Sequence, residues 1–434
     1  MATLPSGLLI ANGNSADGNI LRTDLDYIIT QVNALQTGTI NTSRLVYNTT
    51  IPPSALPAFG TADGIALDSR ASSTSRAVQG YGLPFARRTA MSSMQLAELR
   101  EPAPAYGGFA VPQAGTANVL HWWTQDSIGG FTQRTYALAA TDVPEWCVAA
   151  KSGVIYVSCT GTIKVRQVNT KTGIVADFVD LGAFNTGHAS GAVNVINRVY
   201  INRHGTYLYV VGKRTADTNN RRVFQVRVAT GAIAEWAVSE DRTIVGLAMN
   251  YSGTASTTDT TIIAVATTAL VERHFRTIES AFGTTVSTLR TGALDVVAMC
   301  EHNHGYVVLV SAGGTFRYEV FTYDESIGVA TEPMHSAYIN TLLSNAVTVV
   351  LGMVSDGQTC FVIGHSAGDG VVFAFDPITD AISSSLLFPR RFWHNGGVAP
   401  TRGGGCWTGR CFVFTLNIAA ADMAGGNQTA IALW

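Results

Sequence analysis

The 434-residue sequence predicts an all-β protein built from a repeated unit, and two regularities carry this prediction. The first is a turn residue followed by glycine and an apolar strand, which recurs at Gly153, Gly205, Gly305, Gly357 and Gly409. Successive copies lie 52, 100, 52 and 52 residues apart, and residues 259–266 (DTTIIAVA) stand where the copy missing from the long gap belongs. Six copies at a nearly constant period are the mark of a repeat architecture.

The second regularity is the order of strands within each unit. A short strand rich in Ala, Gly and Val precedes the turn glycine, and a strand–turn–strand segment such as FQVRVATGAIAEWAV follows it. The alternation of Phe224, Val226 and Val228 is typical of a half-buried strand. Small side chains suit a crowded innermost strand near a central axis. Each unit is therefore predicted to be four antiparallel strands, one blade of a β-propeller.

The ring is expected to close with strands from both ends of the propeller region. Residues 119–139 have the pattern of an outer strand pair without an inner pair before it, and residues 393–434 supply an inner pair. Joining them gives six blades within residues 106–434. The final QTAIALW (428–434) could add one more strand, so seven blades is the alternative.

The first 60 residues have a different pattern, and residues 61–105 between them and the propeller are predicted to be a linker region. Residues 23–36 predict a short helix, with Thr23 and Asp26 resembling a capping box and Gly38 ending it. An extended segment with paired prolines follows. The helix carries an apolar stripe at spacings of three and four, formed by Leu25, Ile28, Ile29, Val32 and Leu35. Because a lone helix of this length is marginal in water, the stripe must pack on the propeller or on copies of itself.

Composition excludes several classes of function. Charged residues make up 13% of the chain and the net charge is −2, which argues against a basic nucleic-acid-binding protein. No apolar run reaches the roughly 18 residues of a membrane-spanning helix. The first residues, MATLPSGLLIANG, lack the basic start and apolar core of a secretion signal.

Four motifs that could carry chemistry are better explained by structure. Residues 364–368 (GHSAG) match G-x-S-x-G, but a strand follows where the nucleophile elbow needs a helix, so a hairpin is expected. His302 and His304 form H-x-H without an evident third metal ligand. Residues 355–359 (SDGQT) approach the Asp-box of sialidases, yet a tight Asp-Gly turn explains them. The six cysteines form no C-x-x-C pair. The sequence predicts no catalytic residue, no metal site, no cofactor and no enzymatic activity.

Four tryptophans lie near the two ends of the propeller region and are candidates for glycan contact, because exposed indole faces stack on sugar rings. Packing inside the blades is the alternative for them. They are Trp122, Trp123, Trp393 and Trp407.

Two segments resemble known families. SGVIYVS, HGTYLYVV and RRVFQVRVATGAIAEW resemble the general β-propeller repeat. Residues 12–40 (NGNSADGNILRTDLDYIITQVNALQTGTI) resemble the N-terminal segment of tailed-bacteriophage tail fibres, including the helix start at Asp24-Leu25-Asp26-Tyr27.

The second resemblance implies a virion protein of the phage tail that attaches by its N-terminus and displays the propeller. Its implied partners are other virion proteins (tail or capsid subunits), further copies of itself, with a trimer favoured, and a host cell-surface glycan. The expected function is a tail fibre or receptor-binding protein. The alternatives are a purely structural tail component, such as a nozzle, adaptor or decoration subunit, and a propeller glycan depolymerase.

Overall fold

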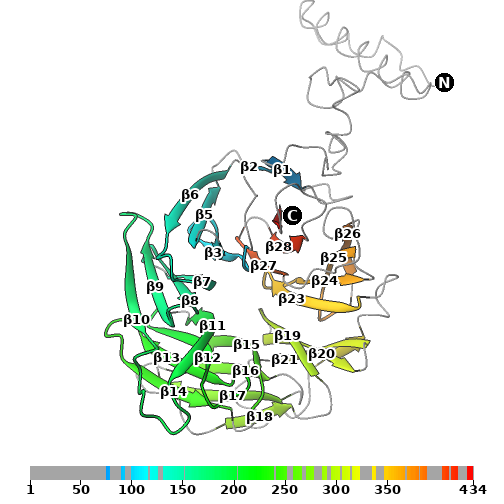
Figure 1. Cartoon of the computed structure of the whole chain (residues 1–434). Helices are drawn as coiled ribbons and strands as arrows, with labels where there is room; N and C mark the ends of the chain where they lie inside the picture. Colours follow the sequence, from blue (N-terminus) through cyan, green and yellow to red (C-terminus); the bar gives the residue numbers. More distant parts are fainter. Residues whose placement is uncertain are drawn as a thin grey trace, which may run out of the picture.

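The protein, represented by a computed structural model, is an all-β ring of sheets arranged around a central axis (Figure 1). The structure describes residues 75–78, 89–92 and most of 99–433. Within the last range it leaves out 116–117, 126–130, 151, 203, 239–240, 252–257, 266–269, 278–285, 291–294, 304, 313–314, 323–334, 339–346, 367–368, 381, 389–402, 410–411 and 419–427. The predicted helix at residues 23–36, with its stripe Leu25 to Leu35, therefore lies outside the described residues.

Seven sheets make up the ring among the described strands, and each is called a blade below. Six have four antiparallel strands, and in each the first strand in the chain lies innermost. Blade 1 consists of β3 (Ala103–Ala105), β4 (Gly108–Gln113), β5 (Val119–Gln125) and β6 (Phe131–Ala137). Blade 2 consists of β7 (Pro144–Ala149), β8 (Val154–Cys159), β9 (Lys164–Asn169) and β10 (Val175–Asp180). Blade 3 consists of β11 (Val193–Ile201), β12 (Tyr207–Arg214), β13 (Arg222–Arg227) and β14 (Ile233–Ala237).

The remaining blades continue in the same order. Blade 4 consists of β15 (Ile244–Tyr251), β16 (Thr258–Val265), β17 (Leu270–Thr277) and β18 (Val286–Arg290). Blade 5 consists of β19 (Asp295–His302), β20 (Gly305–Ala312), β21 (Thr315–Thr322) and β22 (His335–Tyr338). Blade 6 consists of β23 (Val349–Ser355), β24 (Cys360–Ser366), β25 (Asp369–Phe375) and β26 (Ile382–Phe388). Blade 7 has three strands, β27 (Gly403–Trp407), β28 (Phe412–Ile418) and β29 (Gln428–Leu433).

The β-propeller prediction is confirmed, but the count of six blades is wrong, and the described sheets match the alternative of seven. A further copy of the repeat spans the boundary between the predicted linker and the predicted propeller: β3 lies at the end of residues 61–105, and the turn at Tyr106-Gly107, where Gly107 has φ +77°, precedes β4 as Gly153 precedes β8. Pro102, Pro104 and Pro112 hide this copy, because proline is unusual inside a sheet. Blade 1 therefore has its own inner pair, beginning at Ala103, and takes no strand from residues 393–434.

Apolar clusters between neighbouring blades hold the ring together. One cluster joins blades 5 and 6, where Tyr318 and Phe375 pack with ring centroids 4.6 Å apart. Phe361 of blade 6 stacks on Phe412 of blade 7 at 4.5 Å. Comparable clusters join blades 1 and 2, 2 and 3, 3 and 4, and 4 and 5. The core is therefore a series of interfaces between sheets, as the alternating apolar residues in each repeat require.

The inner strands of blades 2 to 6 share an irregularity. In each, the register with the second strand shifts within the inner strand, once in most blades and twice in blade 3, which marks a β-bulge. A bulge turns a side chain away from the regular alternation. The bulged segments contain Glu145, Arg198, Val245, Val297 and Leu351, and these recur at nearly the repeat period.

Blade 1 meets blade 7 where β3 contacts β27 and closes the ring. The Arg100 N–H donates to the Pro112 carbonyl (2.8 Å), so these residues face each other as a hydrogen-bonded antiparallel pair. Such a pair normally exchanges two bonds, but Pro112 has no N–H to return. The Thr415 hydroxyl of β28 donates to the Arg100 carbonyl instead, at 3.2 Å, across 315 residues of sequence. We call this contact the closure bond.

A second pair of strands lies at the same part of the ring. The hairpin β1 (Ser75–Val78) and β2 (Thr89–Ser92) is drawn beside blade 7 in Figure 1, and β1 contacts β29. Segments from both ends of the chain thus meet at blade 7, although they do not share one sheet. Among the described residues, no helix has the length and apolar character needed to cross a membrane.

The closure bond gives a test of ring stability. Thr415 is 1% exposed, so Thr415→Val keeps the side-chain shape but leaves the Arg100 carbonyl without this donor. We expect the free energy of unfolding to fall by about 1 kcal/mol, measured by chemical denaturation. Thr132→Val, on the exposed side of β6, is the matched control. Equal stabilities for the two variants would show that the closure bond contributes nothing.

Candidate functional site

The axis of the ring holds two cavities. The larger, of about 950 Å³, is lined by all seven inner strands near their C-terminal ends and is called the wide chamber. The smaller, of about 240 Å³, lies toward the N-terminal ends of inner strands and is called the narrow pocket. Concave sites of several hundred Å³ are where proteins usually bind small molecules. The axis is therefore the candidate site.

Three half-buried aromatic side chains line the wide chamber: Trp146 on β7, Tyr200 on β11 and Trp407 on β27. They come from separate blades, and Trp146 and Tyr200 lie with ring centroids 6.3 Å apart. None of the three is fully covered, because each stands on an inner strand and lines the axial chamber. The chamber thus presents partly exposed aromatic surface from several directions.

Polar groups at the end of β19 and in the turn after β23 form another part of the chamber wall. His302 is buried, and its Nε2 is 2.8 Å from the carbonyl of Gln358. The N–H of Asn303 donates to the carbonyl of Gly357 at 2.7 Å. Glu301 and Asp356 are exposed carboxylates of this wall. The hydrogen bonds fasten blade 5 to blade 6 and fix the wall in place.

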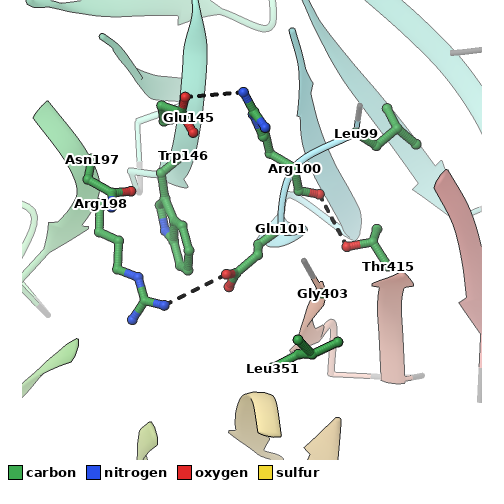
Figure 2. A pocket seen from close by; sticks show the side chains of 10 residues that line it. All are labelled: Leu99, Arg100, Glu101, Glu145, Trp146, Asn197, Arg198, Leu351, Gly403 and Thr415. Atoms are coloured by element: carbon green, nitrogen blue, oxygen red, sulfur yellow. Dashed lines mark hydrogen bonds and ion pairs between the residues drawn. The ribbon is translucent and has the colours of Figure 1, made fainter. Parts of the chain in front are cut away.

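Two ion pairs surround the narrow pocket, as Figure 2 shows. Arg100 is 3.1 Å from Glu145, with its Nε donating to the Pro144 carbonyl at 3.2 Å. Arg198 is 3.7 Å from Glu101 and donates to the carbonyl of Val245. Two guanidinium groups and two carboxyl groups, from blades 2 and 3 and the segment before blade 1, therefore face the pocket, and their charges balance when both carboxyls are ionised.

Glu101 lies in a space that a glycine creates. A Cβ atom built on Gly404 would come within 2.4 Å of the Glu101 side chain, so a larger residue at position 404 would displace that side chain. Burial raises the pKa of Glu101 from 4.5 to about 7, and the nearby Arg198 guanidinium lowers it only in part. The carboxyl therefore changes charge close to neutral pH.

Trp146 separates the two cavities, because it lines both. The Arg198 guanidinium lies over its ring, with the Cζ atom 4.7 Å from the ring centroid, within the range of a cation–π contact. Figure 2 shows Trp146 between Glu145 and the Arg198–Glu101 pair. The ring is thus supported from the narrow-pocket side by a charged network.

The four tryptophans that the sequence offers as glycan contacts do not share one environment in the structure. Trp122 and Trp123 are 8% and 5% exposed. Trp122 donates from Nε1 to the Ala105 carbonyl, and Trp123 stacks on Phe109 at 5.0 Å. Trp122 packs in the cluster between blades 1 and 2, and Trp123 packs against Phe109 of blade 1, so their burial favours the packing alternative over glycan contact. Trp407 lines the wide chamber, and Trp393 lies outside the described residues.

Two of the motifs set aside in the sequence, residues 364–368 and 355–359, fall in the hairpin and the turn that were expected for them. Ser366 pairs with Asp369 in the β24–β25 hairpin, and the next described element is the strand β25, where a nucleophile elbow needs a helix. The Asp356 carboxylate accepts the N–H groups of Gln358 and Thr359 at 2.9 and 2.7 Å, which makes a side-chain-stabilised turn. His304 lies outside the described residues, and among the described ones no group of His, Cys, Asp or Glu could hold a metal.

Other charged clusters are satisfied within single blades. In blade 3, Arg214 is fully buried and donates to Glu235, while Arg222 donates to Asp217 and Glu235. Burial raises the pKa of Glu235, but the hydrogen bonds from Arg214 and Arg222 outweigh it, and the net pKa is lowered. These groups stabilise an outer hairpin and do not face the axis.

The sequence interpretation missed most of the axial residues. Glu145, Arg198 and Leu351 each stand in a bulge six to eight residues before the turn glycine of their blade. Aligning the repeats would have placed them at similar positions. Glu101 carries no such signal, because it precedes blade 1 in the segment that was interpreted as linker.

No protein-family model matches the sequence, and no curated protein matches it. Several solved structures are similar in fold. A streptogramin B lyase has a TM-score of 0.50 at 12% identity, covering 79% of this chain and 95% of its own. A catalytically inactive virginiamycin B lyase from Staphylococcus aureus with quinupristin has a TM-score of 0.50 at 11% identity, covering 82% and 99%. The hydrazine synthase of Kuenenia stuttgartiensis has a TM-score of 0.50 at 10% identity, covering 77% and 96%. At such identities the likeness shows the β-propeller fold alone.

The raised pKa of Glu101 predicts a pH-dependent stability. Between pH 4.5 and about 7 the folded chain holds a proton on this carboxyl that the unfolded chain has lost, so stability falls as pH rises through that window. Glu101→Gln cannot ionise and should remove this contribution. We expect the variant and the unmodified chain to unfold alike at pH 4.5, and the variant to be the more stable at pH 8. Chemical denaturation at both pH values measures this, with Asp295→Asn as an exposed control. A difference that does not change with pH would contradict the assignment.

Proposed function

We propose that the chain is a structural protein of a bacteriophage virion, a tail fibre or receptor-binding protein that displays its β-propeller outward from the tail. The observation that carries the proposal is the division of the chain. Residues 12–40 resemble a tail-fibre attachment segment, whereas every described blade strand comes from residues 103–433. Blades 1 to 6 each have four described strands, and all of these strands come from residues 103–388.

Binding is favoured over a purely structural role by the wide chamber. An axial channel comes with the propeller fold itself, so the feature that favours binding is the partly exposed aromatic surface on the wall of this chamber of about 950 Å³. The proposal assigns the chain no catalytic activity. Its partners are other tail or capsid subunits, further copies of the chain, with a trimer favoured, and a host cell-surface receptor.

The attachment role can be tested through the predicted helix. Ile28→Asp with Val32→Asp puts two charges into the apolar stripe, while Thr30→Asp with Ala34→Asp puts the same charges on the opposite helix face. We expect the first pair to dissociate an oligomer or to abolish incorporation into particles, because buried unpaired charges are costly. The second pair should do neither. Sedimentation of the purified chain and protein analysis of the particles measure the two effects.

The receptor role needs a separate measurement, which is whether the purified chain blocks adsorption of the particles to host cells. Blocking supports a receptor-binding protein. Normal incorporation without blocking supports the purely structural alternative, and release of reducing sugar from host glycans supports a depolymerase. A chain that stays monomeric with and without residues 1–60, and is incorporated normally after truncation, would contradict attachment by this segment.

A further inference from the structure

We propose that the wide chamber binds the end of an uncharged oligosaccharide, with Trp146 and Trp407 as the stacking surfaces. This inference rests on the proposed receptor-binding function and names the class of ligand and its site. Its first support is the lining: Trp146, Tyr200 and Trp407 project from three different blades toward one cavity and remain only half-buried. Large aromatic surfaces with this exposure gain free energy when an apolar sugar face covers them.

The second support is the supply of hydrogen-bonding groups beside the aromatic walls. Asn303, Glu301 and Asp356 stand together at the ends of β19 and β23. Amides and carboxylates offer donors and acceptors for several hydroxyl groups. Their backbone is fixed by the bonds from Asn303 and His302 to the Gly357–Gln358 turn, so little ordering is needed on binding.

The charge of the wall selects against acidic sugars. Among the described residues that line the chamber, Glu301 and Asp356 are carboxylates and none is Lys or Arg. Arg100 and Arg198 line the narrow pocket and are already paired with Glu145 and Glu101. A uronate or sialate would therefore meet like charge without a partner, which disfavours its binding.

The support beneath Trp146 gives this stacking surface a fixed orientation. Arg198 covers the ring from the narrow-pocket side and is itself held by Glu101 and by the Val245 carbonyl. The ring has therefore little freedom to turn out of the chamber wall. The chamber volume of about 950 Å³ lies at the upper end of small-molecule sites and gives room for a short oligosaccharide.

The test uses the full chain on an array of immobilised glycans that includes neutral hexose and N-acetylhexosamine oligosaccharides together with uronate- and sialate-bearing ones. We expect binding to one or more neutral members and to none of the acidic ones. Titration with the best soluble neutral oligosaccharide then compares variants. Trp146→Ala and Trp407→Ala should each weaken binding about tenfold or more, as truncation of a central aromatic anchor does. Trp236→Ala, on the outermost strand of blade 3, is the matched control and should bind normally.

Two further variants keep the test decisive if an alanine variant fails to fold. Trp146→Phe and Trp407→Phe retain a stacking ring, so each should bind within a few-fold of the unmodified chain. The unmodified chain should show a change of tryptophan fluorescence with the same midpoint as binding, and the phenylalanine variants should show less of it.

Three outcomes would overturn the inference: binding of acidic members only, neutral binding that both alanine variants retain, and no binding to the array. The proposed function fails by different results, because incorporation and blocking of adsorption do not depend on the chemistry of the receptor. If the chain blocks adsorption but binds no glycan, the proposed receptor-binding function stands and the inference of an oligosaccharide ligand is wrong.

Discussion

Closure of the ring is the constraint on which the rest of the structure depends. Seven sheets can share an axis only if the first and the last meet, since an inner strand without a neighbour would leave one side of the core open to water. Here the meeting involves Arg100 of the segment before β3 and Thr415 of β28. Pro112 has no N–H to donate to the Arg100 carbonyl, and the Thr415 hydroxyl donates to it from blade 7. The Arg100 carbonyl therefore links blade 1 to blade 7 at a point where the proline interrupts the strand pairing.

The same closure builds one end of the axial site. Leu99, Arg100 and Glu101 reach across from blade 1 to blade 7 and line the narrow pocket, and Gly404 leaves the volume that the Glu101 side chain occupies. The bulges in the inner strands supply the opposite wall, with Glu145 and Arg198 turned toward these residues. Charged groups are therefore brought to the axis by a backbone irregularity and by a chain crossing, and not by the regular alternation of the strands.

This difference explains which features of the fold and of the site could be predicted from the sequence. The period near 51 residues and the alternation in segments such as Phe224–Val226–Val228 are local patterns, so they predicted the propeller and most second strands of the blades. Tyr106-Gly107 was missed because prolines surround it, and the blade count was wrong by one for that reason. Residue type alone could not show that Trp407 lines the axial chamber while Trp122 and Trp123 are buried. Which indole reaches the axis is decided by strand position: β5 is the third strand of blade 1, while β27 is the innermost strand of blade 7.

Trp146 joins the two halves of the axial site into one physical system. Its ring borders the wide chamber, and the guanidinium of Arg198 lies over it from the narrow pocket. Glu101 pairs with that guanidinium only when the carboxyl is ionised, which happens as the pH rises through about 7. The position of the aromatic surface is therefore tied, through Arg198, to the segment that closes the ring. Loosening of the contact between blades 1 and 7 would disturb the chamber without changing any residue on its wall.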